Sequence, residues 1–286
     1  MGSTGLSQLF EHSVAGVTFK AFDNATGGGM SHEGGEIKEE EGTGGQVIEY
    51  RDMVVPTGNV TTSLQTADLL ACIVPASLGS LPAIIKKIQH GVAALASGGR
   101  LHEDCYLKTV KISGAKGGVV GVEYAWIAKS ETPNTTIASA AAKQTGKPFI
   151  WHEFNPLFDS TGLDCISWEA TVDTGVFAET DCDLASSGVQ RLPKEILPGP
   201  FSVAFSARIK TVRTFSFVQD YISTIGFITT ATNQTGSIFT LDMTGGEKLR
   251  INDDPLELGK SGDVVLYQIN GKTQTNDLSA FSATIA

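Results

Sequence analysis

Hydrophobic and polar residues alternate strictly along two segments in the second half of the chain. Every second residue is apolar in 166–173, beginning with Ile166, and in 201–208, beginning with Phe201. A period of two is typical of strands that pack one face and leave the other polar. The segment between them is polar and ends in Pro198, Gly199 and Pro200. The pattern therefore predicts two strands joined by a long loop.

The first half of the chain contains a similar layout. Two apolar residues, a proline with a nearby glycine and a strand-like segment occur at 54–65 and again at 196–203, with Pro56 and Pro198 142 positions apart. Residues 116–124 and 260–267 resemble each other at an offset of 144. Repeats at a fixed period indicate a duplicated unit. We therefore predict a first domain over 1–130, a linker over 131–147 and a second domain over 148–286.

Each predicted unit also contains one short helical pattern. Ser80 is a suitable N-cap, Pro82 fits the first turn, and the apolar residues from Ile84 to Leu95 recur at helical spacing. In the second half, residues 212–224 have a comparable stripe. The remaining segments alternate or end in turn residues. The sequence thus predicts a mainly β protein of two tandem β-barrel or β-sandwich domains, each with one short α-helix.

Composition and charge narrow the classes of function. The 286 residues are 41% hydrophobic and 18% charged, which is typical of a globular protein. A formal net charge of −10 argues against tight binding to a nucleic-acid backbone, though not against nucleic acid moving past the protein. No leader-like segment and no long apolar run is evident, so we expect no membrane association and folding in a cytoplasm.

Motifs that would carry chemistry are weak. The four cysteines are too widely spaced for a disulfide framework, so we expect reduced thiols. Residues 102–105 contain metal-capable side chains, but neighbours on a strand point to opposite faces, which favours a polar turn. Residues 181–183 faintly resemble a calcium loop without its final glutamate. We expect no catalytic residue, no cofactor and no metal.

Two loops depart from any core pattern. Residues 23–45 are rich in glycine and acidic residues, and such a long aperiodic segment is either a disordered loop or an arm that orders against a neighbour. Residues 174–198 occupy the matching position in the second unit. The candidate contact residues are Gly27, Gly35, Glu39, Glu40, Glu41 and Gly44 in the first loop, and Asp181, Asp183 and Arg191 in the second.

The order of segments in the second half resembles the tail tube (major tail) proteins of long-tailed phages and archaeal tailed viruses. The loop that enters the returning strand in that family has the pattern Pro-x-x-Ile-x-Pro-Gly, which Pro193, Ile196, Pro198 and Gly199 match. The first half is similar more loosely, since Thr57 separates its proline from its glycine.

This resemblance implies a structural role. Subunits of the family join their sheets into a ring, and a chain with two units implies a trimeric ring with pseudo-six-fold symmetry. Stacked rings form a tube through which viral DNA leaves the capsid without specific binding. The implied partners are other copies of the chain and the tape measure, distal tail and terminator proteins. The implied location is the virion tail, assembled in the host cytoplasm.

Two other classes compete with the tail tube. A capsid decoration or other virion surface-binding protein would also be β-rich and oligomeric, but aromatic loop tips would be expected. A β-sandwich hydrolase would need a histidine beside a nucleophile in a cleft. Either face of the predicted strands is a candidate for the lining of a tube.

Overall fold

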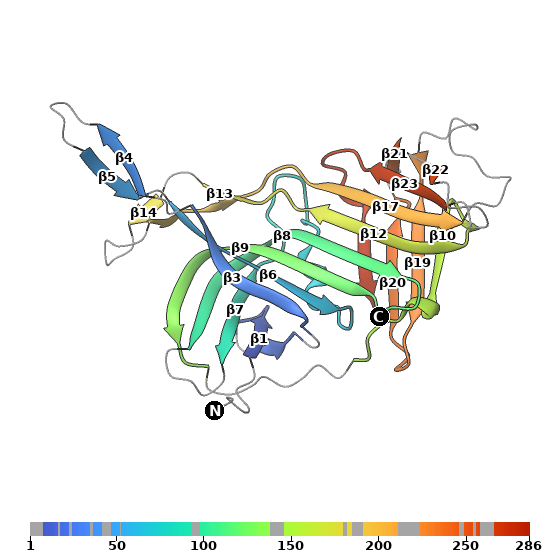
Figure 1. Cartoon of the computed structure of the whole chain (residues 1–286), viewed down its shortest axis with the longest axis horizontal. Helices are drawn as coiled ribbons and strands as arrows, with labels where there is room; N and C mark the ends of the chain where they lie inside the picture. Colours follow the sequence, from blue (N-terminus) through green and yellow to red (C-terminus); the bar gives the residue numbers. More distant parts are fainter. Residues whose placement is uncertain are drawn as a thin grey trace.

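The computed structural model describes residues 8–16, 18–22, 25–34, 37–41, 47–51, 53–92, 98–137, 146–179, 182–184, 191–210, 224–245, 249–253, 256–257 and 266–286. Antiparallel strands dominate these residues, and their only helices are three single-turn 3₁₀ helices. The prediction of a mainly β fold is confirmed (Figure 1).

The strands of the first half are β1 (Gln8–Ser13), β2 (Lys20–Ala21), β3 (Gly27–Gly34), β4 (Ile37–Glu41), β5 (Val47–Arg51), β6 (Val54–Ser63), β7 (Ile85–Val92), β8 (Gly99–Ala115) and β9 (Gly121–Thr135). Those of the second half are β10 (Phe154–Phe158), β11 (Thr161–Gly162), β12 (Cys165–Asp173), β13 (Phe177–Ala178), β14 (Cys182–Leu184), β15 (Arg191–Pro193), β16 (Ile196–Leu197), β17 (Ser202–Lys210), β18 (Thr224–Ile225), β19 (Phe227–Thr232), β20 (Ile238–Met243), β21 (Leu249–Asp253), β22 (Leu256–Glu257), β23 (Leu266–Lys272) and β24 (Ser282–Ile285). The 3₁₀ helices are η1 (Leu70–Cys72), η2 (Trp151–Glu153) and η3 (Leu278–Ala280).

Within the described residues, the largest sheet has thirteen strands and branches at β8. From Gly99 to Cys105, β8 pairs with β7, whereas from Thr109 to Ala115 the same strand pairs with β12. The opposite edge of β8 pairs with β9 throughout. The strands β3, β6, β9, β8, β12, β17, β23 and β21 thus follow one another across a sheet shared by both halves (Figure 1). The division into domains at 131–147 stays a prediction, and β9 extends through the first part of that segment.

The two halves repeat the same order of strand pairs. The neighbours β3, β6, β9 and β8 correspond to the neighbours β12, β17, β23 and β21. In the same way the pairs β1–β2 and β1–β7 correspond to β10–β11 and β10–β19. Both halves also have a register shift at the matching place, between Leu107 and Thr109 in β8 and between Ile251 and Asp253 in β21. The sequence echo at offsets of 142 and 144 therefore coincides with an equivalent order of strands.

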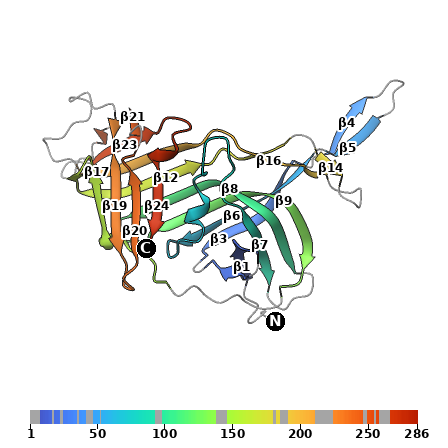
Figure 2. The ribbon, with the colours of Figure 1, turned by 180° about the vertical axis from the view of Figure 1, so that it is seen from behind.

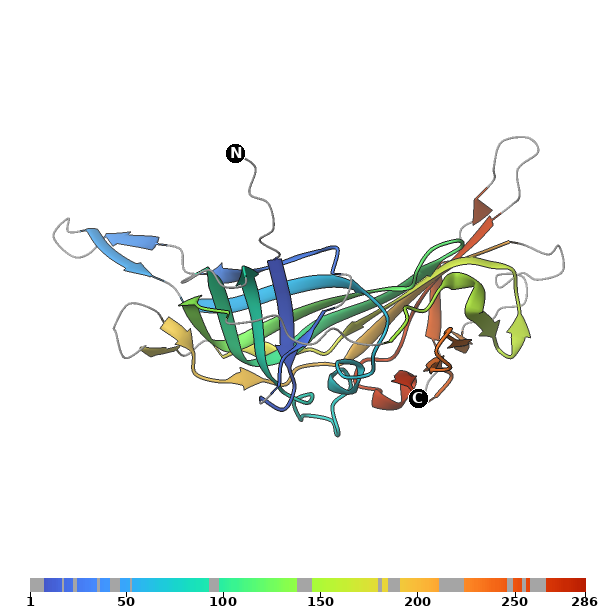
Figure 3. The ribbon, with the colours of Figure 1, turned by 90° about the horizontal axis from the view of Figure 1, so that it is seen from below.

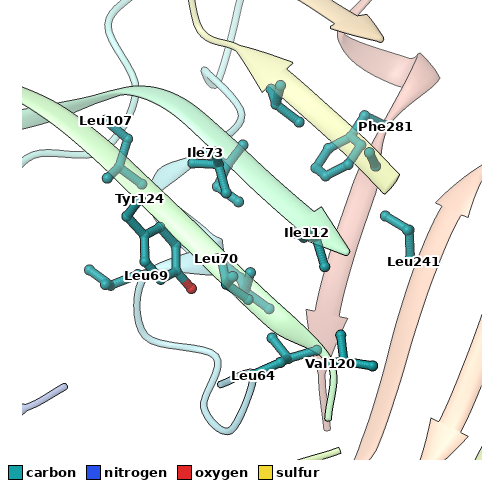
Figure 4. Close-up of a cluster of buried hydrophobic side chains, with 14 of the residues drawn as sticks. Leu64, Leu69, Leu70, Ile73, Leu107, Ile112, Val120, Tyr124, Leu241 and Phe281 are labelled. Atoms are coloured by element: carbon teal, nitrogen blue, oxygen red, sulfur yellow. The ribbon is translucent and has the colours of Figure 1, made fainter. Parts of the chain in front are cut away.

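A second sheet covers the core side of the second half. It runs in the order β11-β10-β19-β20-β24 (Figure 2). Its buried residues, such as Phe227 and Leu241, contact the larger sheet in one continuous hydrophobic cluster. Figure 4 shows Ile112 and Val120 of the first half beside Leu241 and Phe281 of the second. One core therefore spans the two halves.

The prediction of a helix that begins at Ser80 is wrong. Residues 81–84 have no regular secondary structure, and β7 then runs from Ile85 to Val92. Ile85 and Ile88 are 0% and 1% exposed and belong to the same hydrophobic cluster, whereas the side chains of Lys86 and Lys87 between them are 47% and 37% exposed. The strict alternation is broken here, beside Asp104 of the neighbouring β8, whose φ is +50°. Buried apolar residues three apart therefore imitate helical spacing. The helix predicted over 212–224 lies outside the described residues, except for Thr224, which is in β18.

Candidate functional site

The side of the large sheet that faces away from the core is lined mainly by polar and charged side chains. Over residues 109–113 of β8, 167–173 of β12 and 202–208 of β17, every second residue is buried and the intervening residues are accessible. We call the accessible set the polar face. Its residues are Glu123 on β9; Thr109, Lys111 and Ser113 on β8; Ser167, Glu169, Thr171 and Asp173 on β12; Ser202, Ala204, Ser206 and Arg208 on β17; and Gln268, Asn270 and Lys272 on β23.

Charges on the polar face are mixed in sign. Lys111 stands opposite Glu123 in the β8–β9 register, and its Nζ lies 2.7 Å from Oε2 of Glu169. The other charged members are Asp173, Arg208 and Lys272. Beside the face, Lys210 Nζ lies 3.1 Å from Asp164 Oδ2. The face is therefore nearly neutral although the whole chain has a net charge of −10, so the excess of negative charge lies elsewhere.

The outermost strand of the first half is β3. Among the described residues it pairs only with β6. It begins with three glycines, and a Cβ added at Gly27 or Gly29 would meet nothing within 4 Å. An unpaired row of backbone groups is a template for another strand. Gly27 and Gly29 therefore leave that edge free of side chains on the side of the polar face.

A segment of the second half folds back over the first half. We call residues 174–179 and 191–200, which contain β13, β15 and β16, the strap. Val176 and Ile196 of the strap pack against Val55 and Ile127, and all four side chains are under 9% exposed. Phe177 in β13 remains 47% exposed. The strap is therefore anchored by a hydrophobic cluster separate from the main core.

The predicted motif lies at the base of the strap. Pro193 and Ile196 are buried, and Pro198 and Gly199 are half-buried. A Cβ at Gly199 would collide with the carbonyl oxygen of Gly175, whose φ of +75° itself requires glycine. The motif therefore provides one anchor side chain and a close crossing of two backbone segments.

The strands β4 and β5 form a two-stranded arm that projects from the same end of the molecule as the strap (Figure 1, Figure 3). Among the predicted contact residues, Gly27 lies in β3, the acidic run 39–41 in β4, Asp183 in β14 and Arg191 in β15. Gly35, Gly44 and Asp181 lie outside the described residues. The structure thus places the two predicted contact loops at one end.

A polar cluster that sequence reasoning missed fastens β3 to β8 and β9. His32 Nε2 contacts Oε2 of Glu131, and Arg100 Nη1 donates to the Met30 carbonyl oxygen at 3.3 Å. Trp126 Nε1 donates to Nδ1 of the buried His102 at 3.1 Å. Burial lowers the pKa of His102 to about 4, and the opposing effect of the Glu131 carboxylate, which raises this pKa, is smaller. No spacing rule connects residues this far apart in the chain.

The described residues contain little that suggests catalysis. Burial raises the pKa of the Cys72 thiol to about 11 and that of Cys165 to about 12, which disfavours the reactive thiolate. No group of three His, Cys, Asp or Glu side chains in the described part of the chain is placed to hold a metal ion. In the same part, no helix has the length and apolarity needed to cross a membrane.

Comparison with known proteins leaves the fold and its surfaces as the evidence on function. No family model matches the chain, and no curated protein is significantly similar to it in sequence.

Proposed function

We propose that the protein is a structural subunit of a virion tail tube. Three copies form a ring of six similar units, rings stack into a tube, and viral DNA passes through the lumen. In this proposal each chain contributes two tandem tube-type β domains, joined where β8 pairs with β12. The protein has no enzymatic role in the virion tail, and it is assembled in the host cytoplasm.

The observation that carries the proposal is the repeated order of strands in one sheet. The set β3, β6, β9 and β8 is followed directly by the equivalent set β12, β17, β23 and β21. A unit that pairs head-to-tail with its own repeat can continue to pair with further units, and such a contact closes a ring when the rotation allows. Closure also removes the exposed edge at β3, which is a hazard for a monomer.

The polar face has the properties expected of a lumen for DNA. It carries several hydroxyl side chains, its charged residues are balanced in sign, and Lys111 is paired with Glu169. Binding of a duplex requires free cations that displace counterions from phosphates. A lining in which positive and negative side chains balance would let a polyanion slide. This argument assigns the polar face to the lumen and the opposite face to the core.

The arm and the strap suit contacts between stacked rings. Both project at one end, and both interrupt equivalent strand pairs, the arm between β3 and β6 and the strap between β12 and β17. In this proposal they contact the next ring or, at the ends of the tube, the distal tail and terminator proteins. The tape measure protein would occupy the lumen before the DNA.

A capsid decoration protein is the alternative, and the exposed Phe177 favours it. Electron microscopy of the purified chain at rising concentration separates the two. Rings whose class averages show three-fold symmetry, stacking into tubes, are the expected result. A protein that stays monomeric at every concentration and binds isolated capsids would overturn the tail-tube proposal and establish the alternative.

A further inference from the structure

The junction between the two halves of one chain also indicates how two chains join. It rests on the proposed function, because it concerns contacts between copies. Inside the chain, β8 of the first unit pairs with β12 of the second. The equivalents of β8 are β21 and β22, and the equivalent of β12 is β3. These two equivalents lie on opposite sides of the molecule (Figure 1). We propose that the β21–β22 edge of one copy pairs antiparallel with β3 of the next copy.

The first step in fixing the register is the match between β8 and β22. Ile112 pairs with Val122 and Ser113 with Gly121, just after the register shift in β8. After the corresponding shift in the second half, Leu256 pairs with Tyr267 and Glu257 with Leu266. Counted from the two shifts, Ile112 corresponds to Leu256 and Ser113 to Glu257.

The second step is the match between β3 and β12. Next to the shifts, Trp126 pairs with Gly58, and the equivalent Gly271 pairs with Phe205. In the first half the glycine lies on β6 and the aromatic residue on β9, whereas in the second half the aromatic residue lies on β17 and the glycine on β23. Each pair therefore combines one aromatic side chain with one glycine.

Met30 pairs with Gly58, and Ala170 pairs with Phe205, so Met30 corresponds to Ala170. Gly29 then corresponds to Glu169.

The internal junction now gives the register between copies. Ala170 pairs with Ile112, and Glu169 pairs with Ser113. Replacing each residue by its equivalent places Met30 of one copy opposite Leu256 of the next, and Gly29 opposite Glu257.

The edges suit this pairing. Among the described residues, β22 has a partner only in β23 and β3 only in β6. The first pair is apolar on both sides. In the second, Gly29 leaves room for the neighbouring strand, since a Cβ there would meet nothing within 4 Å. Arg100 donates to the Met30 carbonyl, and a carbonyl oxygen can accept a second hydrogen bond.

Disulfide trapping tests the register. We expect Gly29→Cys combined with Glu257→Cys to give, on oxidation of assembled protein, covalent dimers and closed trimers that disappear on reduction. Directly opposed Cβ atoms lie about 5 Å apart, within reach of a disulfide after small shifts. The matched control is Gly27→Cys with Glu257→Cys, because Gly27 is as open as Gly29 but two residues out of register. It should cross-link far less. Ser113→Cys with Glu169→Cys should form the equivalent bond within one chain.

Micrographs of the same samples separate the outcomes. Rings that fail to cross-link through 29 and 257, or that cross-link equally through 27 and 257, would overturn this edge pairing and leave the proposed tube intact. Absence of any assembly by the wild-type chain would overturn both. If only the cysteine variant fails to assemble, a reconstruction of wild-type rings tests the register instead. Met30 of one copy should then lie opposite Leu256 of the next, and any other pairing would overturn the proposal.

Discussion

Lys111 and Glu169 meet across the strand pair that joins the two halves of the chain, with Nζ 2.7 Å from Oε2. Their side chains are 40% and 39% exposed, so solvent screens the attraction. Exposed pairs of this kind contribute less than about 1 kcal/mol to stability. The main effect of this ion pair is therefore to neutralise Lys111 on the polar face, and its contribution to stability is small.

Removing the carboxylate should make the polar face bind DNA. We expect Glu169→Gln to change the free energy of unfolding by less than about 1 kcal/mol. Assembled variant protein should retain duplex DNA at low salt, with the logarithm of the binding constant falling by about 0.9 per logarithmic unit of salt for each new phosphate contact. Co-sedimentation measures this retention. Glu103→Gln is the control, because it frees Lys87 from an equally exposed pair away from the polar face. Equal retention by both variants would contradict the prediction.

Gly58 should tolerate no side chain. An added Cβ would overlap the ring of Trp126, which is 1% exposed and bonded to His102. We expect Gly58→Ala to lower the free energy of unfolding by about 1–3 kcal/mol, since overpacking forces neighbours from their preferred rotamers. Gly29→Ala, where nothing lies within 4 Å, should change it by less than about 0.5 kcal/mol. Denaturant unfolding compares them, and equal losses would refute the explanation.

The sequence predicted those elements in which one face is buried and the other is open. The alternation in 166–173 and 201–208 corresponds to β12 and β17, because Trp168 and Phe205 pack inward while their neighbours stay on the polar face. The prediction failed for β7, where the alternation is broken and the buried residues Ile85 and Ile88, three apart in one hydrophobic cluster, imitate a helix.

Contacts between distant segments could not be read from the sequence. The β8–β12 junction and the pairing of His32 with Glu131 have no local signal, because strand order is set by the packing of the whole core. The motif around Ile196 was visible, but its role as an anchor depends on Val55 and Ile127, far away in the chain.

Two buried histidines should make stability depend on pH. Burial lowers the pKa of His12 and of His102 from 6.5 to about 4 in the folded protein. Between these values the unfolded state binds more protons, so the free energy of unfolding falls as the pH is lowered from about 6.5 towards 4. The loss by pH 5 should be about 2 kcal/mol per histidine. The free energy of unfolding should differ less between pH 7 and pH 5 for His12→Leu than for wild type.

The control is His152→Leu, at an exposed position, which should show the same difference as wild type. An identical pH dependence in all three proteins would contradict the role given to His12.

The strap should open locally when its anchor is shortened. Ile196 is 6% exposed and packs with Val55, Ile127 and Val176 in a cluster separate from the main core. Truncating a buried isoleucine to alanine typically costs about 2–5 kcal/mol, and here the cost should fall on the strap because its cluster is separate from the main core. We expect Ile196→Ala to accelerate hydrogen exchange in β13 and β16 but not in β12 or β17.

The control is Ile238→Ala, at a position that is 46% exposed, which should leave hydrogen exchange in all four of these strands unchanged. If the tube proposal holds, Ile196→Ala should form rings that no longer stack. Faster exchange throughout β12 and β17 would show instead that the strap belongs to the cooperative core.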